Sequence, residues 1–139
     1  MRTVFADTAY WIALANPRDG LWTQVELVNR SMQPFEIVTT DEVLAEFVTY
    51  FRDWGPFWRE KVAILVRSTL EGEGVEVIEQ TRESFLSGLA LYEARLDKEY
   101  SLTDCISMET MRQRDLTDVL TADRHFTQEG FHKLLGQGR

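Results

Sequence analysis

Near the start of the chain stands the sequence Thr3-Val4-Phe5-Ala6-Asp7, and the fold class follows from how often its pattern recurs. It is a short run of apolar and β-branched residues that stops at an acidic residue, as a buried strand followed by a polar turn does. Three further runs of this kind follow, and a weaker one ends the series. They cover residues 35–39, 75–78 and 118–122, with the weaker run at 131–135.

Helical patterns fill the segments between these runs, with apolar residues at intervals of three and four and turn or capping residues at the ends. The predicted helices cover residues 8–15, 22–32, 40–51, 57–70, 81–96 and 105–114. Strands that alternate with helices are joined by right-handed crossovers in a parallel sheet. We therefore predict an α/β three-layer sandwich, with a central, mostly parallel sheet of four to five strands and helices on both faces, in a single domain spanning residues 1–139.

Length and composition exclude several classes of protein. The chain has 139 residues, of which 15 are Lys or Arg and 23 are Asp or Glu, so its net charge is −8. This excess of acidic residues excludes a protein that binds nucleic acids or membrane surfaces through a uniformly basic surface, but it is compatible with a local basic patch. The single cysteine, Cys105, excludes a disulfide framework and favours a reducing compartment. No secretory signal or membrane-spanning run is visible, so we expect a soluble, cytoplasmic protein without a membrane partner.

Three acidic residues are expected at one edge of the sheet. Asp7 directly follows the first strand, Asp123 follows the fourth, and Asp104 stands at the start of a helix. The carboxyl ends of parallel strands form the ligand-binding edge of an open α/β sheet. Carboxylates gathered there repel one another unless a cation neutralises them, and such oxygen ligands suit Mg²⁺ or Mn²⁺. A structural alternative stays open for each, because the start of a helix favours a carboxylate in any case.

A fourth acidic residue has to be chosen between Glu42 and Glu46, which lie four residues apart on one predicted helix. Glu42 has a structural role open to it, since Thr39 and Glu42 have the spacing of a capping box. Glu46 has no capping role, and taken alone it could be a solvated residue on the flank of the helix. It lies at the edge of the apolar stripe of the helix, from which a carboxylate can reach toward the strand ends. We therefore predict that Glu46 is the fourth site residue.

Four stretches of the sequence contain these acidic residues in order. They are Val4-Phe5-Ala6-Asp7-Thr8, Thr39-Thr40-Asp41-Glu42-Val43-Leu44-Ala45-Glu46-Phe47, Ser101-Leu102-Thr103-Asp104-Cys105 and Leu120-Thr121-Ala122-Asp123-Arg124-His125-Phe126. The set resembles the motifs of the PIN-domain nucleases, in particular the small VapC-type toxins of toxin–antitoxin pairs. The resemblance spans nearly the whole chain, and it is the order and spacing of the set that make it specific.

The resemblance implies a PIN-like fold and a metal-dependent ribonuclease that leaves a 5′-phosphate and a 3′-hydroxyl. The acidic residues would be catalytic and would hold Mg²⁺ or Mn²⁺, Glu46 either directly or through water. The four that match the family's positions are Asp7, Glu46, Asp104 and Asp123. Neighbouring hydroxyl groups would orient the carboxylates or contact a phosphate. These hydroxyl residues are Thr8, Ser101, Thr103 and Thr121.

The resemblance also implies three partners: an RNA substrate, a cognate antitoxin that blocks the site, and a second copy of the chain in a homodimer. RNA contact draws on basic side chains, which are scarce in this chain. The candidates near the acidic residues are Arg112, Arg114, Arg124 and His125. The helices of residues 22–70 are rich in Trp, Phe and Val, so an apolar groove there could accept an amphipathic helix of the antitoxin.

Two other classes of function fit the sequence less well. The main alternative is a catalytically silent PIN-like module that binds RNA or protein, and the complete acidic set argues against it. An aspartyl phosphatase needs a second acidic residue two positions after its nucleophile, but that position holds Ala9. A phospho-receiver domain needs paired acidic residues near the end of the first strand and a lysine after the last one, and neither arrangement is present.

Overall fold

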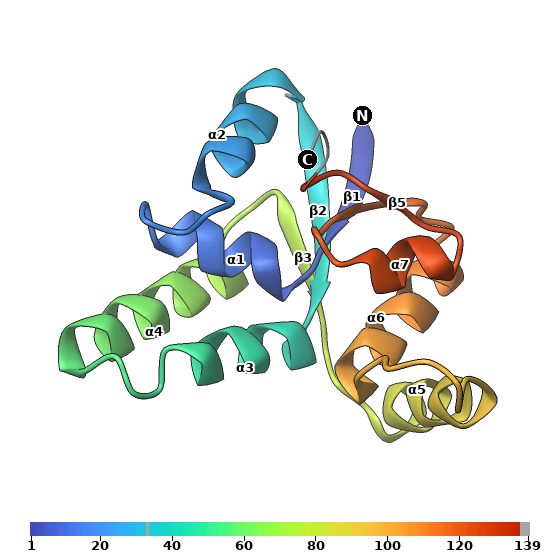
Figure 1. Cartoon of the computed structure of the whole chain (residues 1–139). Coiled ribbons are helices and arrows are strands. Elements are labelled where there is room, and N and C mark those ends of the chain that lie inside the picture. Colours follow the sequence, from blue (N-terminus) through green and yellow to red (C-terminus); the bar gives the residue numbers. More distant parts are fainter. Residues whose placement is uncertain (33, 137–139) are drawn as a thin grey trace.

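A computed structural model of the chain describes residues 1–32 and 34–136 (Figure 1). Within these residues, five parallel strands form one sheet with the order β3-β2-β1-β4-β5. The strands are β1 (Arg2–Ala6), β2 (Phe35–Thr40), β3 (Val75–Ile78), β4 (Asp118–Leu120) and β5 (His132–Lys133). This all-parallel sheet confirms the predicted α/β fold class.

Helices connect each strand to the next. They are α1 (Thr8–Ala15), α2 (Trp22–Ser31), α3 (Asp41–Tyr50), α4 (Pro56–Glu71), α5 (Arg82–Ala94), α6 (Leu102–Gln113) and α7 (Arg124–Gln128). In Figure 1, α1 to α4 lie on one side of the sheet and α5 to α7 lie on the other. Right-handed crossovers explain this division, because the strand order runs one way from β1 to β3 and the opposite way from β1 to β4 and β5.

The reversal of the strand order creates a switch point between β1 and β4. On β1, Phe5 pairs with Val38 of β2 on one side and with Val119 of β4 on the other. At such a point, the connections after the two strands leave toward opposite faces of the sheet, and the crevice between them is where open α/β sheets bind ligands. The residues that follow β1 and β4 are therefore in the position expected of a functional site.

The core is built around the central strand. Val4, Phe5 and Ala6 of β1 have no exposed surface, as expected for a parallel strand covered by helices on both faces. Phe47 of α3 and Phe126 of α7 are also fully buried, one from each helical layer. No helix in the described part of the chain is both long and apolar enough to span a bilayer.

The predicted elements are all present, and the differences lie at their ends. The helix predicted for residues 105–114 begins at Leu102 and ends at Gln113. It starts earlier because Ser101 caps it, so that Asp104 lies inside its first turn. The fourth strand ends at Leu120 rather than at residue 122, since the chain turns there toward α7.

Candidate active site

Two of the predicted acidic residues lie at the switch point of the sheet. Asp7 follows β1 directly, and Asp123 follows β4 after two residues. The backbone N–H of Asp7 donates to the carbonyl of Leu120 at 3.3 Å. The Thr121 hydroxyl donates to Oδ2 of Asp7 at 2.9 Å and accepts from the N–H of Asp123 at 3.1 Å. A single threonine thus fixes the positions of both acidic residues.

Asp7 is buried, with only 6% of its surface exposed. It occupies the N-cap position of α1, but its side chain makes no capping hydrogen bond. Burial, followed by the negative charge of Asp104, raises the pKa of Asp7 to about 7. Burying a carboxylate in such surroundings costs stability unless a cation lies beside it. Helix capping therefore does not account for the position of Asp7, and a bound cation would offset the cost of burying its carboxylate.

Four carboxylates, those of Asp7, Glu46, Asp104 and Asp123, form an acidic cluster. Asp104 interacts electrostatically with each of the other three. Its carboxylate accepts from the N–H of Ser101 at 3.1 Å, and its own N–H donates to the Ser101 hydroxyl at 3.0 Å. Burial raises the pKa of Asp104, and the charges of Asp123 and Glu46 raise it further. Because Asp104 also raises the pKa of Asp7, it interacts with all three other members.

Glu46 joins the acidic cluster from α3. The Thr8 hydroxyl donates to Oε1 of Glu46 at 2.5 Å, and Thr8 is the residue next to Asp7 in the chain. The Glu46 side chain is half-buried, and its charge contributes to the raised pKa values of Asp7 and Asp104. The second turn of α3 thus carries a carboxylate over the carboxyl end of β1.

The capping box predicted for Glu42 is wrong. The N-cap residue of α3 is Thr40, whose hydroxyl accepts a backbone N–H of the first turn at 3.1 Å. Thr39 is instead a fully buried residue of β2, and its hydroxyl donates to the carbonyl of Ala6 at 2.8 Å. Glu42 lines a different surface hollow, next to the start of α5.

His125 brings an imidazole ring to the acidic cluster. Asp123 caps α7, and its Oδ1 accepts from the backbone N–H of His125 at 2.9 Å. Nδ1 of the ring lies 3.3 Å from Oδ1 of Asp123 and 3.7 Å from Oδ2 of Asp104. Ligand atoms of these three residues lie within 4.8 Å of one another. Arg124, between Asp123 and His125 in the chain, is exposed.

Three of the four hydroxyl residues predicted to orient the carboxylates contact the acidic cluster. They are Thr8, Ser101 and Thr121. Thr103 is half-buried in the first turn of α6, and in the described part of the chain no hydrogen bond joins it to the four carboxylates. Adjacent residues of a helix point about 100° apart, so Thr103 and Asp104 face different directions.

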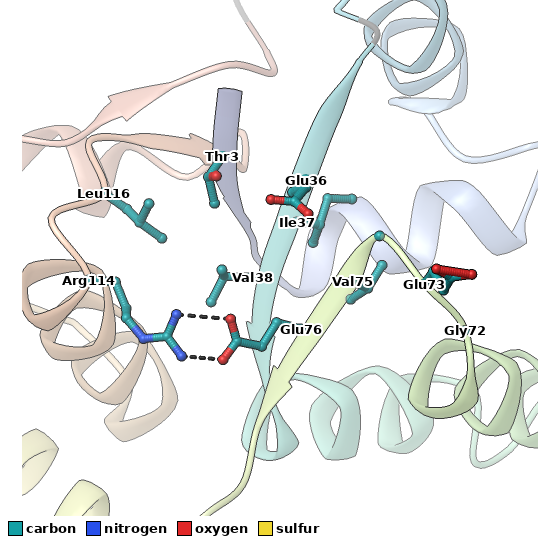
Figure 2. A pocket seen from close by; sticks show the side chains of 11 residues that line it. Thr3, Glu36, Ile37, Val38, Gly72, Glu73, Val75, Glu76, Arg114 and Leu116 are labelled. Carbon is teal, nitrogen blue, oxygen red and sulfur yellow. Dashed lines mark hydrogen bonds and ion pairs between the residues drawn. The ribbon is translucent and has the colours of Figure 1, made fainter. Parts of the chain in front are cut away.

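Arg112 and Arg114 do not lie at the acidic cluster. Arg112 lies in the last turn of α6 and Arg114 is the residue that ends the helix, eight and ten residues after Asp104, which places them roughly 12–15 Å along the helix axis. Arg114 pairs with Glu76 of β3, and Figure 2 shows this pair lining a surface hollow of about 450 Å³ on the sheet. Arg112 pairs with Glu129. Both predicted RNA contacts are therefore neutralised by carboxylates that the sequence does not place beside them.

Glu129 binds Arg95, Tyr100 and Arg112, and this Glu129 cluster stabilises the segments that carry the acidic residues. The Glu129 side chain is 5% exposed, and it accepts hydrogen bonds from Arg95 at 2.7 Å, Tyr100 at 2.9 Å and Arg112 at 2.6 Å. Tyr100 directly precedes the residue that caps α6, and its ring meets the His125 ring edge-on at 5.4 Å. This cluster is absent from the sequence-based prediction, because no local pattern marks partners that lie 17 to 34 residues apart.

Glu129→Gln is expected to lower the free energy of unfolding by about 2 kcal/mol at neutral pH, because it removes charge-assisted hydrogen bonds to a buried carboxylate. Burial raises the pKa of Glu129, but hydrogen bonds from Arg95, Arg112 and Tyr100 outweigh this effect and lower the pKa from 4.5 to about 2. The stabilisation is therefore complete above about pH 4.5 and is lost as the pH falls toward 2. Urea unfolding at pH 7 and pH 3 should show a smaller difference between wild type and variant at pH 3.

Glu76→Gln is the matched control. It breaks the exposed pair with Arg114, and exposed pairs contribute less than about 1 kcal/mol. If the free energies of unfolding of wild type and Glu129→Gln differ by the same amount at pH 7 and at pH 3, ionised Glu129 does not stabilise the fold.

The donor set of the site fits a divalent cation. Carboxylate oxygens are the ligands that Mg²⁺ and Mn²⁺ prefer. A cation would offset the burial, and then the like charges, that raise the pKa values of Asp7 and Asp104. Nδ1 of His125 is buried and makes no hydrogen bond, so it is also available to a cation. Carboxylate sites of this kind support metal-assisted hydrolysis of phosphate esters.

Comparisons with known proteins agree with this architecture. A family model described as the PIN domain matches residues 4–131. Among solved structures, Mycobacterium tuberculosis VapC20, a toxin that cleaves the sarcin–ricin loop, matches with a TM-score of 0.80 at 22% sequence identity, and the match covers 92% of this chain and 95% of that chain. No curated protein matches the chain by sequence.

Two further solved structures are similar in fold. VapBC2 from Rickettsia felis, solved bound to a DNA fragment from its promoter, has a TM-score of 0.62 at 13% identity over 94% of this chain and 96% of that chain. FitAcB from Neisseria gonorrhoeae has a TM-score of 0.59 at 14% identity over 94% of this chain and 95% of that chain. With a family match over nearly its whole length and the fold of VapC-type toxins, this chain belongs to the PIN domain family.

Proposed function

We propose that this protein is a metal-dependent endoribonuclease and the toxin of a toxin–antitoxin pair. The observation that carries the proposal is the acidic cluster at the switch point of the sheet, in which Asp104 interacts electrostatically with the other three members. Membership of the PIN domain family supports nuclease chemistry. The likeness in fold to a toxin that cleaves the sarcin–ricin loop supports RNA as the substrate.

Each member of the acidic cluster has a role in this proposal. The ligands of Mg²⁺ or Mn²⁺ are Asp7, Asp104 and Asp123, with Glu46 binding directly or through a water. When bound there, such an ion would polarise a phosphodiester oxygen and would lower the pKa of a water for in-line attack. The Thr121 hydroxyl holds Asp7, and the Thr8 hydroxyl holds Glu46. These hydrogen bonds keep the carboxylates in place, so that they need not reorganise when the ion and the substrate bind.

Partners bind around this site in the proposal. Arg124 is exposed beside Asp123, and we expect it to contact a phosphate of the RNA. The antitoxin is expected to cover apolar side chains of α4, where Phe57 is 69% and Ile64 is 59% exposed. We place the single-domain chain in the cytoplasm, as its length and its single cysteine suggest. We also expect it to form a homodimer, as its resemblance to VapC-type toxins implies.

Glu46→Gln is expected to lower the rate of RNA cleavage by about 10²-fold, because it removes a negative charge from the group that holds the ion and the attacking water. Glu42→Gln is the matched control, since Glu42 lies one turn earlier on the same helix and lines a different hollow. The Glu42 variant should cleave within about twofold of wild type. Equal losses in both variants, measured on labelled RNA, would contradict the role given to Glu46.

The proposed function is tested by incubating the purified protein with ribosomal and transfer RNA in Mg²⁺, in Mn²⁺ and in chelator. We expect cleavage with either ion, none in chelator, and products that carry a 5′-phosphate and a 3′-hydroxyl. A folded wild-type protein that cleaves none of these RNAs would favour the silent binding module. Products with a 2′,3′-cyclic phosphate would show a different, metal-independent chemistry.

A further inference from the structure

The His125 ring is held rigidly at the acidic cluster. It lies in the first turn of α7, one edge of it meets the Tyr100 ring at 5.4 Å, and 21% of the side chain is exposed. Tyr100 is itself fixed by its hydrogen bond to Glu129 at 2.9 Å. The orientation of the imidazole is therefore set by its surroundings before any ligand binds.

The inward nitrogen of this ring has no hydrogen-bond partner. Nδ1 is buried and faces two carboxylate oxygens, Oδ1 of Asp123 at 3.3 Å and Oδ2 of Asp104 at 3.7 Å. Both distances exceed the 2.7–2.9 Å or so of a charge-assisted N–H···O bond. Two neighbouring ligands of an octahedral ion with bonds of about 2.1 Å stand about 3 Å apart. Nδ1 thus makes no hydrogen bond to either carboxylate, and its separations from the two oxygens are close to those between neighbouring ligands of one ion.

We propose that His125, through Nδ1, is a direct ligand of the ion that Asp104 and Asp123 hold, and that this nitrogen makes the site selective for Mn²⁺ over Mg²⁺. Both ions prefer oxygen ligands, but Mg²⁺ keeps its waters, whereas Mn²⁺ is the one of the two that also accepts an imidazole nitrogen. The inference rests on the proposed metal site, and it replaces the RNA contact predicted for His125 with contact to the ion.

Pulsed electron paramagnetic resonance of bound Mn²⁺ tests this ligand directly, because a coordinated imidazole couples its ¹⁴N nucleus to the unpaired electrons. The chain has two histidines, His125 and His132, and His132 is exposed and bonded to Asp118 at 3.0 Å, on the sheet. His132→Ala is therefore the matched control. In tag-free protein we expect ¹⁴N coupling in wild type and in His132→Ala, and its loss in His125→Ala and His125→Gln.

Calorimetric titration gives a second readout that does not depend on cleavage. His125→Ala should weaken Mn²⁺ binding about tenfold and leave Mg²⁺ binding within about twofold, while His132→Ala changes neither. Mn²⁺ bound by the wild type without ¹⁴N coupling would overturn the inference and leave the acidic cluster as an all-oxygen site. A wild type that binds no Mn²⁺ at all would overturn the proposed metal site, and the inference with it.

Discussion

Asp104→Asn is expected to abolish RNA cleavage, with a loss of about 10³-fold or more. Asp104 is the member of the acidic cluster that interacts with all the others, so we expect loss of its charge to weaken binding of the proposed ion strongly. A bound metal ion contributes several kcal/mol to such a reaction, and each 1.4 kcal/mol or so corresponds to a tenfold change in rate. Single-turnover cleavage of labelled RNA, with the protein in excess, measures the loss without interference from product release.

The same substitution is expected to raise the stability of the metal-free protein by about 1 kcal/mol, because it removes a buried charge from among like charges. Asparagine can still accept the capping hydrogen bond from the Ser101 N–H, so the start of α6 is preserved. Glu109→Gln, on the same helix and paired with Arg112, is the control and should leave cleavage within about twofold. Cleavage by Asp104→Asn at the wild-type rate would place the site elsewhere.

Divalent ions are expected to produce the second large effect, a rise in melting temperature that depends on pH. The pKa of Asp7 is about 7 in the folded protein, against 3.8 for an unperturbed aspartate. Between these values the folded state binds more protons than the unfolded state, so stability without metal falls as the pH rises from about 4 to about 7 and then levels off. An ion held by ionised Asp7 removes this cost.

At pH 8, Mn²⁺ at about 100 times its dissociation constant should stabilise the fold by about 2.7 kcal/mol, or raise its melting temperature by roughly 8 °C. Asp7→Asn should remove most of the decline of stability between pH 4 and pH 7, because part of it is due to the raised pKa of Asp104, and most of the rise caused by Mn²⁺. Differential scanning fluorimetry over this pH range, with and without Mn²⁺, records both effects. An Asp7→Asn variant that Mn²⁺ stabilises as strongly as wild type would exclude Asp7 as a ligand.

The fold could be predicted from the sequence because its elements have strong local signals. Buried parallel strands are continuous apolar runs, as in Val4-Phe5-Ala6, and the helices between them have clear periodicity. The ends of elements are harder to place. Thr39 and Thr40 are chemically alike, and only the tertiary contact of the Thr39 hydroxyl with Ala6 leaves Thr40 as the cap of α3.

The acidic part of the site could be anticipated for a similar reason. Asp7 and Asp123 follow strands that lie side by side, so topology alone brings them together. Glu46 is predicted from its place at the edge of an apolar stripe. The basic residues could not be predicted in this way, because the pairing of Arg114 with Glu76 joins residues 38 positions apart. Proximity in sequence is a poor guide to which cations remain available for a substrate.

In the proposed function, RNA cleavage requires a divalent ion held by the acidic cluster. The most direct test is to titrate Mn²⁺ into metal-free protein and to measure ion occupancy and the rate of RNA cleavage on the same samples. We predict that the rate rises in proportion to occupancy of the site, and that Asp104→Asn loses both together. Cleavage that proceeds at full rate in chelator, or that does not change as the site fills, would contradict the claim.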